Sequence, residues 1–463
     1  MTAAPPTQRE AESAAPTRGA RSATHGAFWS FAGYGGSQVI RLGANLLLTR
    51  MLFREHYGLM AFTTVFMQGM QMFSDIGLGP NIVQNERGDD PRFLNTAWTM
   101  GVIRGFALWL IACIGAVPFA MAYRQPILAL IIPLSGFTAL LAGVNSTKLF
   151  SRVRDLDLKR FVSIDLASQI AGALTMIAWA LVDRSVWALV AGGIVAAIVK
   201  CALSHLALPG EDNHFAWDAS AASSIFRFGM WIFLSTILAF LDRQGHTLIF
   251  GQLIPIALLG VYSIATMLAQ MPAMSLGHLC QNVLFPLFSR LRNRGEAVAP
   301  VFLRARFSLL VVSGWALAGF IGGGTTAIDL LYSEDFRGAG WMLSLLSIGS
   351  WFSILESTNG SALLSSGKAN FVAASGAAKV IALVLLIPLG FHLGGFPGAV
   401  LACALTDFFK YAVSATAVAS LGFSAWRKDL LLSGYVAATA GAGYLAASAI
   451  RHEQDGFGTI VLA

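Results

Sequence analysis

The chain has 463 residues, of which 56% are hydrophobic and only 12% are charged, and its mean hydropathy is +0.66. A soluble domain carries roughly 25% charged residues, so this composition excludes a soluble globular protein and predicts several membrane spans. The formal net charge of +7 does not indicate nucleic-acid binding, because no soluble module is present to carry a basic face.

Residues 1–23 are rich in Ala, Pro, Thr and Ser, which predicts a disordered cytoplasmic tail. No short apolar core precedes a small-residue cleavage site, so this tail is not expected to be a signal peptide. Thirteen apolar stretches follow, each long enough to cross a membrane. They lie at 26–50, 57–79, 95–122, 126–147, 161–182, 185–205, 226–251, 254–279, 300–323, 340–362, 370–392, 396–420 and 430–450.

The connections between these stretches are short. The longest clearly polar connection follows the sixth stretch, at 208–222. None could hold a soluble catalytic domain, so we expect recognition to take place within or at the membrane. Nineteen Lys and Arg residues lie in the tail and in or beside alternate connections, against six in or beside those of the opposite side. Because positive charge favours the cytoplasmic side, the N-terminus is predicted to be cytoplasmic.

The second half of the chain repeats part of the first half at an offset of 202 residues. Arg41 falls on Arg243, Gly58 on Gly260 and Gln68 on Gln270 without a gap. The offset moves the chain by six predicted spans, an even number, so both copies cross the membrane in the same direction. Chance similarity between apolar helices is the alternative explanation.

The repeat predicts five parts of the chain. They are the tail at 1–23, an N-terminal six-helix lobe at 24–207, a cytoplasmic linker at 208–222, a C-terminal six-helix lobe at 223–420, and one or more extra helices at 421–463. We expect a pseudo-two-fold axis along the membrane normal to relate the two lobes.

Polar side chains recur at helical spacing inside several spans, so each set shares one helix face. Such faces either bond helix to helix or line a water-filled cavity, and both interpretations stay open for the uncharged residues. The candidates for lining a cavity are Gln38, Asn45, Gln68, Gln71 and Gln270. The ionisable residues within spans are Arg41, Asp75, Arg104, Asp165, Asp242, Arg243, Arg306, Glu356, Lys379, Asp407 and Lys410.

The stretch FLDRQGHTLIFG at 240–251 carries the most unusual of these charges. Asp242 and His246 share a face, and they are candidates for responding to protons or for pairing with the adjacent Arg243. Asp407 and Lys410 are three residues apart and are expected to pair with each other.

Three further ionisable residues have local explanations. Asp165 and Arg306 lie near predicted span ends, where their side chains would reach the interface. Asp75 is expected to accept backbone N–H bonds where glycines and a proline break the helix after residue 76.

Motifs for enzymatic chemistry are missing. The four cysteines, Cys113, Cys201, Cys280 and Cys403, lie far apart, so no zinc site is indicated. The stretch SSGKAN at 365–370 lacks the earlier glycine of a phosphate loop. We therefore expect no catalytic residue, no cofactor and no metal in this chain.

Two stretches resemble a known family. LLLTRMLFREHYGLMAFTTVFMQGMQMFSDIGLGPNIVQ at 46–84 resembles the opening of the Wzx-type oligosaccharide flippases. LDRQGHTLIFGQLIPIALLGVYSIATMLAQMP at 241–272, with NVLFPLFSRL at 282–291, resembles their second-half signature. These proteins belong to the MATE-like multidrug/oligosaccharidyl-lipid/polysaccharide exporter superfamily. The resemblance, which covers most of 26–420, implies an all-α polytopic membrane protein with about 12–14 transmembrane helices in two six-helix lobes around a central cavity.

The resemblance also implies a function. The chain would carry an undecaprenyl-pyrophosphate-linked oligosaccharide across the bacterial inner membrane by alternating access, for exopolysaccharide, capsule or O-antigen synthesis. Membrane lipid, a polysaccharide polymerase and export machinery would be its further partners. Arginine suits phosphate, so Arg41, Arg243 and Arg104 are the candidates for holding the diphosphate. Asp242, His246 and Asp75 are the candidates for coupling or ion pairing.

Two other functions are considered. An ion-coupled drug or cation antiporter of the same superfamily would be expected to favour acids in its cavity, and Arg41 and Arg243 at equivalent repeat positions argue against it. A polysaccharide polymerase would be expected to expose a substantial periplasmic loop with catalytic residues, and no such loop is visible in the sequence.

Overall fold

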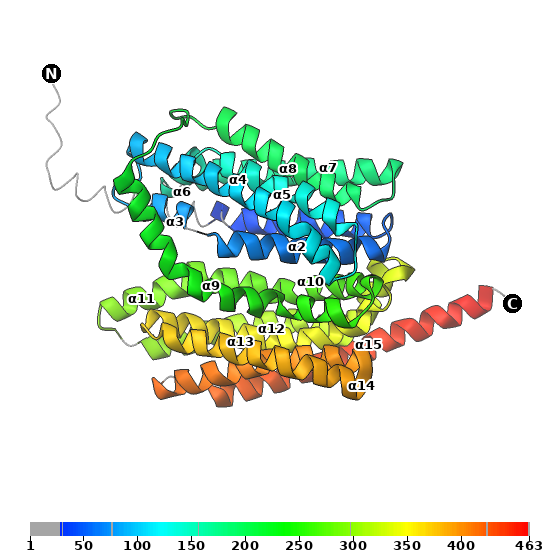
Figure 1. Cartoon of the computed structure of the whole chain (residues 1–463). Coiled ribbons are helices and arrows are strands. Elements are labelled where there is room, and N and C mark those ends of the chain that lie inside the picture. The colour runs from blue at the N-terminus through cyan, green and yellow to red at the C-terminus, as the bar shows by residue number, and fades with distance from the viewer. Residues whose placement is uncertain are drawn as a thin grey trace, which may run out of the picture. The chain divides into compact units, whose positions relative to one another are not determined.

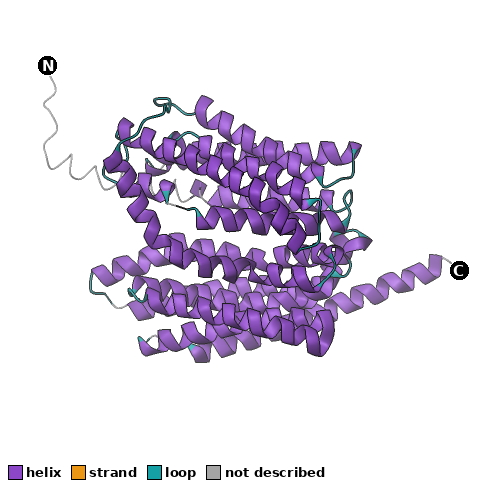
Figure 2. Cartoon of the chain, in the orientation of Figure 1, coloured by secondary structure: helices purple, strands orange, loops and turns teal. Residues whose placement is uncertain are grey.

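The computed structural model describes residues 28–29, 31–75, 77–155, 157–296, 298–422 and 425–461. The predicted tail at 1–23 lies outside these residues. The described part of the chain is built from helices and short connections and contains no strand (Figures 1 and 2).

The chain divides into two compact units. The first comprises the described residues up to Leu52 together with Phe66–Leu234, and the second comprises Phe53–Val65 together with the described residues from Ser235 onward. The division passes through helices α2 (Arg54–Phe73) and α9 (Ala219–Leu253), so each of them contributes to both units.

The first unit contains a helical stretch at 31–48 and six labelled helices that it alone contains. They are α3 (Leu78–Gln84), α4 (Pro91–Ala122), α5 (Leu128–Val144), α6 (Lys148–Arg154), α7 (Leu158–Val182) and α8 (Trp187–Leu206). α4 packs on α5, and α8 packs on both α5 and α7. Small residues allow the close approach of α4 and α5: a Cβ at Gly143 would lie 2.4 Å from the Gly101 carbonyl oxygen.

The second unit contains α10 (Ile256–Leu279), a π-helical turn (Cys280–Leu284), α11 (Phe285–Asn293), α12 (Val298–Leu331), a 3-10 turn (Glu334–Phe336), α13 (Ala339–Ser365), α14 (Ala369–Ser420) and α15 (Trp426–Val461). α13 lies against α10, α12 and α14 and is largely buried. Phe288, Phe302 and Trp351 belong to the apolar core of this unit.

α14 is interrupted in its middle. Gly394 and Gly395 have non-helical backbone angles, and Gly395 has φ 60° and ψ −150°, a region that is essentially restricted to glycine. The break divides α14 where the predicted spans 370–392 and 396–420 are separated.

Seven described helices are long and apolar enough to cross a membrane, or eight if the bent pair α5 and α6 counts as one span. The chain is therefore a multi-pass membrane protein. Each of the thirteen predicted spans overlaps a helical segment of the described residues. Several boundaries differ. The second span was predicted to reach residue 79, but α2 ends at Phe73 and the short α3 begins at Leu78. α9 begins at Ala219 instead of residue 226, and α12 continues to Leu331 instead of ending at residue 323.

Two glycines that are equivalent under the 202-residue offset meet in the second unit. A Cβ at Gly260 of α10 would lie 1.9 Å from the Arg54 carbonyl oxygen and 3.0 Å from the Gly58 nitrogen of α2. A Cβ at Gly58 would lie 2.2 Å from the Ile256 carbonyl oxygen. Any larger residue at either position would have to separate the two helices.

Candidate functional site

A cluster of charged side chains lies inside the helices of the second unit. Asp242 of α9 lies between two lysines of α14: its Oδ1 is 3.0 Å from Lys379 Nζ and its Oδ2 is 2.9 Å from Lys410 Nζ. Lys379 Nζ is also 2.8 Å from Asp407 Oδ1, and Lys410 Nζ is 3.5 Å from Glu356 Oε2 of α13. We call these five residues the charge cluster.

The charge cluster is shielded from solvent. The side chains of Asp242 and Lys410 are 16% exposed and that of Glu356 is 8% exposed. Ionised groups are costly to bury unless each meets an opposite charge, and here three carboxyl groups share two ammonium groups. Lys379 and Lys410 lie on opposite sides of the α14 break, so the cluster ties both halves of α14 to α9, while Glu356 brings in α13.

The structure corrects two expected ion pairs. Asp407 was predicted to pair with Lys410, but it pairs with Lys379, because α9 and α13 bring Asp242 and Glu356 to Lys410. Asp242 was a candidate partner of Arg243, but it pairs with the two lysines. Adjacent residues on a helix point about 100° apart, so the neighbours in sequence face different surroundings.

The two repeat-related arginines are exposed. Arg243 in α9 and Arg41 in the helical stretch 31–48 both have exposed side chains, and neither forms an ion pair within the described part of the chain. A guanidinium at the depth of a membrane span is unfavourable against lipid. These two side chains therefore require polar surroundings.

His246 lies one turn after Asp242 but in a different environment. Its side chain is buried, its Nδ1 is 3.0 Å from Thr247 Oγ1, and its ring meets the Tyr262 ring edge-on at 5.7 Å. Its Nε2 has no hydrogen-bond partner among the described residues. The Tyr262 hydroxyl is in turn 3.4 Å from Cys403 Sγ.

Arg104, predicted to hold a diphosphate, binds the end of a helix in the first unit. Its Nε donates to Ser74 Oγ at 3.1 Å and its Nη2 donates to the Gln71 carbonyl at 2.9 Å. These bonds satisfy acceptors at the C-terminal end of α2. Asp75, which follows Ser74, accepts the Gly77 N–H at 2.9 Å. This is the local role expected for it.

The predicted cavity-lining residues are partly accessible. Gln38 donates to the Tyr34 hydroxyl at 2.8 Å, one turn before it on the same face. Gln71 is exposed, whereas Gln38, Asn45, Gln68 and Gln270 are half-buried.

Two ion pairs were missed in the sequence, one buried and one partly exposed. Arg306 was expected to reach the interface, but its side chain is 3% exposed and lies 2.9 Å from Asp429 Oδ2. Tyr411 donates to the same oxygen at 2.7 Å, and Asn359 accepts from Arg306. The predicted span began at residue 430, so Asp429 was not counted among the intramembrane charges.

The second missed pair lies in the first unit. Asp165 was expected to reach the interface from near a span end; it lies in the first turns of α7, and it accepts from Lys200 Nζ at 2.6 Å and from Gln169 Nε2 at 2.7 Å. Ser37 donates to Gln169 Oε1 and extends this polar chain to the helical stretch 31–48. Opposite charges on the neighbouring apolar stretches 161–182 and 185–205 were the available signal.

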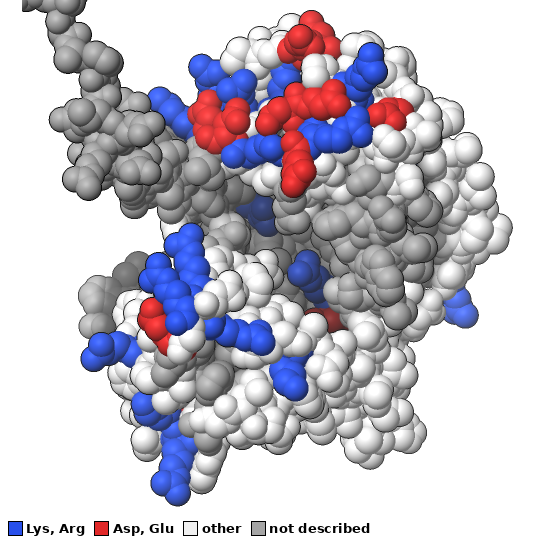
Figure 3. Space-filling model, turned by 90° about the vertical axis from the view of Figure 1, so that its left-hand side faces the viewer, with Lys and Arg blue, Asp and Glu red and all other residues white. Residues whose placement is uncertain are grey.

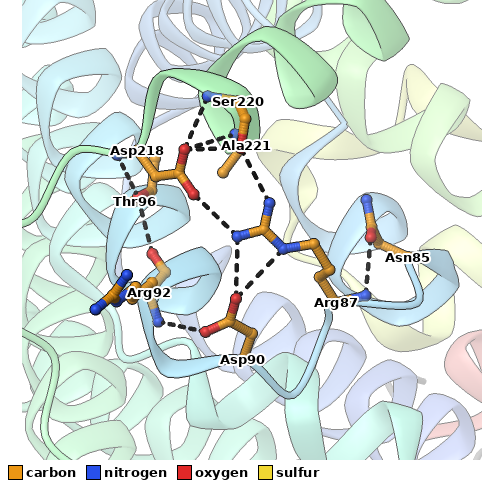
Figure 4. A network of polar contacts seen from close by, with 8 residues as sticks. All are labelled: Asn85, Arg87, Asp90, Arg92, Thr96, Asp218, Ser220 and Ala221. Carbon is orange, nitrogen blue, oxygen red and sulfur yellow. Dashed lines mark hydrogen bonds and ion pairs between the residues drawn. The ribbon is translucent and has the colours of Figure 1, made fainter.

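The connections of the first unit form a second polar network, at the end where α3 and α6 lie. Arg87 Nη2 lies 3.0 Å from Asp90 Oδ2 and 2.9 Å from Asp218 Oδ2, and its Nη1 donates to Ser220 Oγ (Figure 4). The pKa of Asp218 lies well below its usual range. The hydrogen bond from the Arg87 guanidinium is the largest cause, and the Ser220 hydroxyl and N–H contribute less. Arg87 also lowers the pKa of Asp90, with help from the Arg92 N–H.

Further hydrogen bonds hold the segment 208–218 against α4 and the start of α6, within the first unit. Asn213 Oδ1 accepts the Thr147 N–H at 3.0 Å, the His214 N–H donates to Asn95 Oδ1, and the Asp218 N–H donates to Thr96 Oγ1. Lys148 Nζ lies 2.8 Å from Asp212 Oδ1 and lowers the pKa of that carboxyl. Figure 3 shows acidic and basic side chains intermixed in the upper part of the view.

The described residues contain no group of three or more His, Cys, Asp or Glu side chains that could hold a metal ion. Within the charge cluster, the space between the carboxylates is filled by lysine ammonium groups. The cluster is therefore suited to ion pairing or to proton exchange.

Solved structures of two transporter types share this fold. The chain superposes on lipid II flippase MurJ in an inward closed conformation with a TM-score of 0.65 and 12% identity, covering 92% of this chain and 99% of that one. An inward-facing MATE multidrug resistance transporter of the MOP superfamily gives a TM-score of 0.61 at 11% identity, covering 87% and 95%. The fold is thus MATE-like, as the resemblance implied.

Sequence relatives come from polysaccharide synthesis. The lipopolysaccharide biosynthesis protein WzxC of Escherichia coli is 23% identical over 84% of this chain and 79% of its own length. The teichuronic acid biosynthesis protein TuaB of Bacillus subtilis is 22% identical over 65% of this chain, a match that takes in 62% of TuaB. The family described as polysaccharide biosynthesis protein matches residues 47–339, more than half of the chain. The chain belongs to this family of polysaccharide biosynthesis proteins.

Proposed function

We propose that the chain is a transporter that moves a lipid-linked oligosaccharide across a membrane by alternating access, and that it is not an enzyme. The family and the names of the relatives WzxC and ExoT, a succinoglycan biosynthesis transport protein of Rhizobium meliloti, support this class of cargo. The single observation that carries the proposal is the pair of exposed arginines, Arg41 and Arg243, inside helices of a membrane protein.

The chemistry of the cargo explains these arginines. A lipid-linked oligosaccharide joins a hydrocarbon tail to a polar glycan through a diphosphate. The glycan hydroxyls would lose their hydrogen bonds to water in the hydrocarbon core, at a cost of roughly 2–7 kcal/mol for each unsatisfied polar group. A polar cavity lowers this barrier, and a guanidinium gives a phosphate two charge-assisted hydrogen bonds. Arg41 and Arg243 would hold the diphosphate, and Arg104 keeps free N–H groups that could join them.

The finer features of the proposal follow the sequence. Two six-helix lobes at 24–207 and 223–420, a linker at 208–222 and the extra helix at 421–463 would form the transporter. Its N-terminus would lie in the cytoplasm and the protein in the bacterial inner membrane, because of the charge asymmetry between alternate connections. The cargo would be carried on undecaprenyl pyrophosphate and delivered to a polysaccharide polymerase and export machinery.

The charge cluster supports a coupling role for Asp242. Three carboxyl groups face two ammonium groups, so one carboxyl group can take up a proton without leaving a lysine unpaired. Protonation of Asp242 would weaken the tie between α9 and the two halves of α14. The Nε2 of His246, one turn away, has no hydrogen-bond partner among the described residues and would accept or pass on that proton, whereas Asp75 would serve the local helix end.

The rival functions fit less well. A drug or cation antiporter would need accessible acids, whereas the acids of the charge cluster are already paired with lysines. A polymerase would need a large loop with catalytic groups, and the described connections between the helices are short.

The test is loss of the gene in its host, followed by complementation. Without the protein, lipid-linked repeat units should accumulate facing the cytoplasm. The wild type and the matched control Arg184→Ala, which removes an exposed arginine from a connection, should restore transport. Arg41→Ala and Arg243→Ala should reach the membrane and fail to transport. Accumulation facing the periplasm would indicate a polymerase, and wild-type transport by both variants would disprove the cationic-cavity mechanism.

A further inference from the structure

A pocket of about 530 Å³ opens at one end of the first unit, where α7 begins and α8 ends. Its polar side is formed by Lys159, Arg160 and Ser163, and its apolar side includes Ile164, Leu206 and Leu208. The volume falls within the range of roughly 300–1,000 Å³ that is typical of small-molecule sites. The pocket is separate from the charge cluster, which lies in the second unit.

The two cationic side chains of the pocket are at most partly paired with acids among the described residues. Lys159 forms no ion pair within the described part of the chain, and its Nζ lies 5.7 Å from the centre of the Trp29 ring. Arg160 Nε is 3.7 Å from Asp157 Oδ2, which leaves its terminal N–H groups unpaired by that acid. The Ser163 hydroxyl donates to the Lys159 carbonyl at 2.8 Å. A ligand here would meet the positive charges of Lys159 and Arg160, and also the Asp157 carboxylate, which lies near Arg160.

The apolar side is built into the fold and continues to the surface. Ile164 and Leu208 belong to a buried apolar cluster with Leu149, so this wall is held in place by the core. The Arg152 guanidinium donates to the Pro209 carbonyl at 3.0 Å and fixes the chain just after α8. Leu206, the last residue of α8, is 84% exposed. An apolar side chain in this position at the end of an apolar span is suited to contact with acyl chains.

We propose that this pocket binds the head group of an anionic phospholipid, with the phosphate between Lys159 and Arg160 and an acyl chain along Leu206. Basic pockets at the ends of transmembrane helices suit phosphate head groups, and an apolar wall beside them distinguishes a lipid from a soluble anion. Trp29 beside Lys159 is the kind of residue that is enriched at membrane interfaces. The site would hold a resident lipid against the first unit and is independent of the cargo.

The experiment uses the full chain purified in a neutral detergent, with lipids added and retained lipid counted by native mass spectrometry. Phosphatidylglycerol and phosphatidylcholine are the anionic and the zwitterionic probes. One basic residue near an anionic lipid surface contributes about a fivefold preference. The variant Lys159→Gln/Arg160→Gln should therefore bind phosphatidylglycerol about 25-fold more weakly and phosphatidylcholine equally well. The charge-matched control Arg124→Gln/Arg184→Gln should bind both lipids as the wild type does.

Two further measurements keep the test decisive. The swapped variant Lys159→Arg/Arg160→Lys preserves both charges and should retain the preference, even if the neutral double variant does not fold. Inorganic phosphate at millimolar concentration should not displace phosphatidylglycerol from the wild type. Displacement by phosphate would show a site for a soluble anion and overturn the proposal. An unchanged preference in the neutral variant, or an equal loss in the control, would also overturn it.

Discussion

Removing Lys379 should destabilise the second unit far more than an ordinary substitution on a helix. Lys379 Nζ bridges Asp242 and Asp407 at 3.0 and 2.8 Å with a side chain that is 13% exposed. In Lys379→Met, three carboxyl groups would face the single ammonium group of Lys410. Leaving one buried charge without its partner costs about 3–5 kcal/mol. For a unit of this size, that corresponds to a fall in melting temperature of roughly 6–20 °C.

The assay is thermal unfolding of the purified protein in detergent, followed by intrinsic fluorescence, with Arg337→Met as a control that removes an exposed positive charge. The double variant Lys379→Met/Asp407→Asn removes one charge of each sign and leaves Asp242 with Lys410, so it should recover at least half of the loss. If Lys379→Met melts like the wild type, the charge cluster does not stabilise the fold. If the double variant melts as low as the single variant, the loss comes from packing and not from unpaired charge.

Four other outcomes are expected. Gly260→Ala should destabilise the protein, because its Cβ would lie 1.9 Å from the Arg54 carbonyl, whereas Gly319→Ala in α12, where nothing lies within 4 Å, should not; equal melting temperatures would refute the close contact. Asp90 and Asp218 have lowered pKa values, so the hold of Arg87 on the segment 208–218 should be complete above the unfolded pKa of about 3.9 and lost as pH falls through the lowered values. Arg87→Ala should expose that segment to protease at neutral pH, and unchanged cleavage would contradict this role. The variant Ser151→Cys should resist an external thiol reagent in intact cells, because residue 151 is proposed to lie on the cytoplasmic side. Ready labelling from outside would contradict the proposed topology.

The positions of the helices could be predicted from the sequence because each membrane span depends mainly on its own residues. Length, hydropathy and breaks at glycine and proline are local properties, and Gly394 and Gly395 separate two predicted spans where the backbone of α14 is interrupted. The end of α2 was placed too late, because the helix ends at Phe73, ahead of the glycines and the proline at 77–80 that mark the break in the sequence.

The pairing of charges could not be predicted in the same way. Helical spacing identifies neighbours on one helix, such as Asp407 and Lys410, but it does not say which other helix lies closer. Asp242 and Lys410 are 168 residues apart in the chain, and their pairing depends on the packing of α9 against α14. The same holds for Arg306 and Asp429, whose contact requires α12 to lie beside α15.

The two kinds of charge in the described helices differ in a way that bears on transport. Lys379 and Lys410 each pair with two acids and Arg306 pairs with one, and these contacts hold the helices of the second unit together. Arg41 and Arg243 are exposed and form no ion pair within the described residues. A cation that is already paired would have to lose its partner before it could bind a phosphate, which makes loading costly. An exposed cation can bind and release an anion at a smaller cost. In the proposed mechanism, the positive charge open to a diphosphate would therefore be that of Arg41 and Arg243 and not that of the paired lysines.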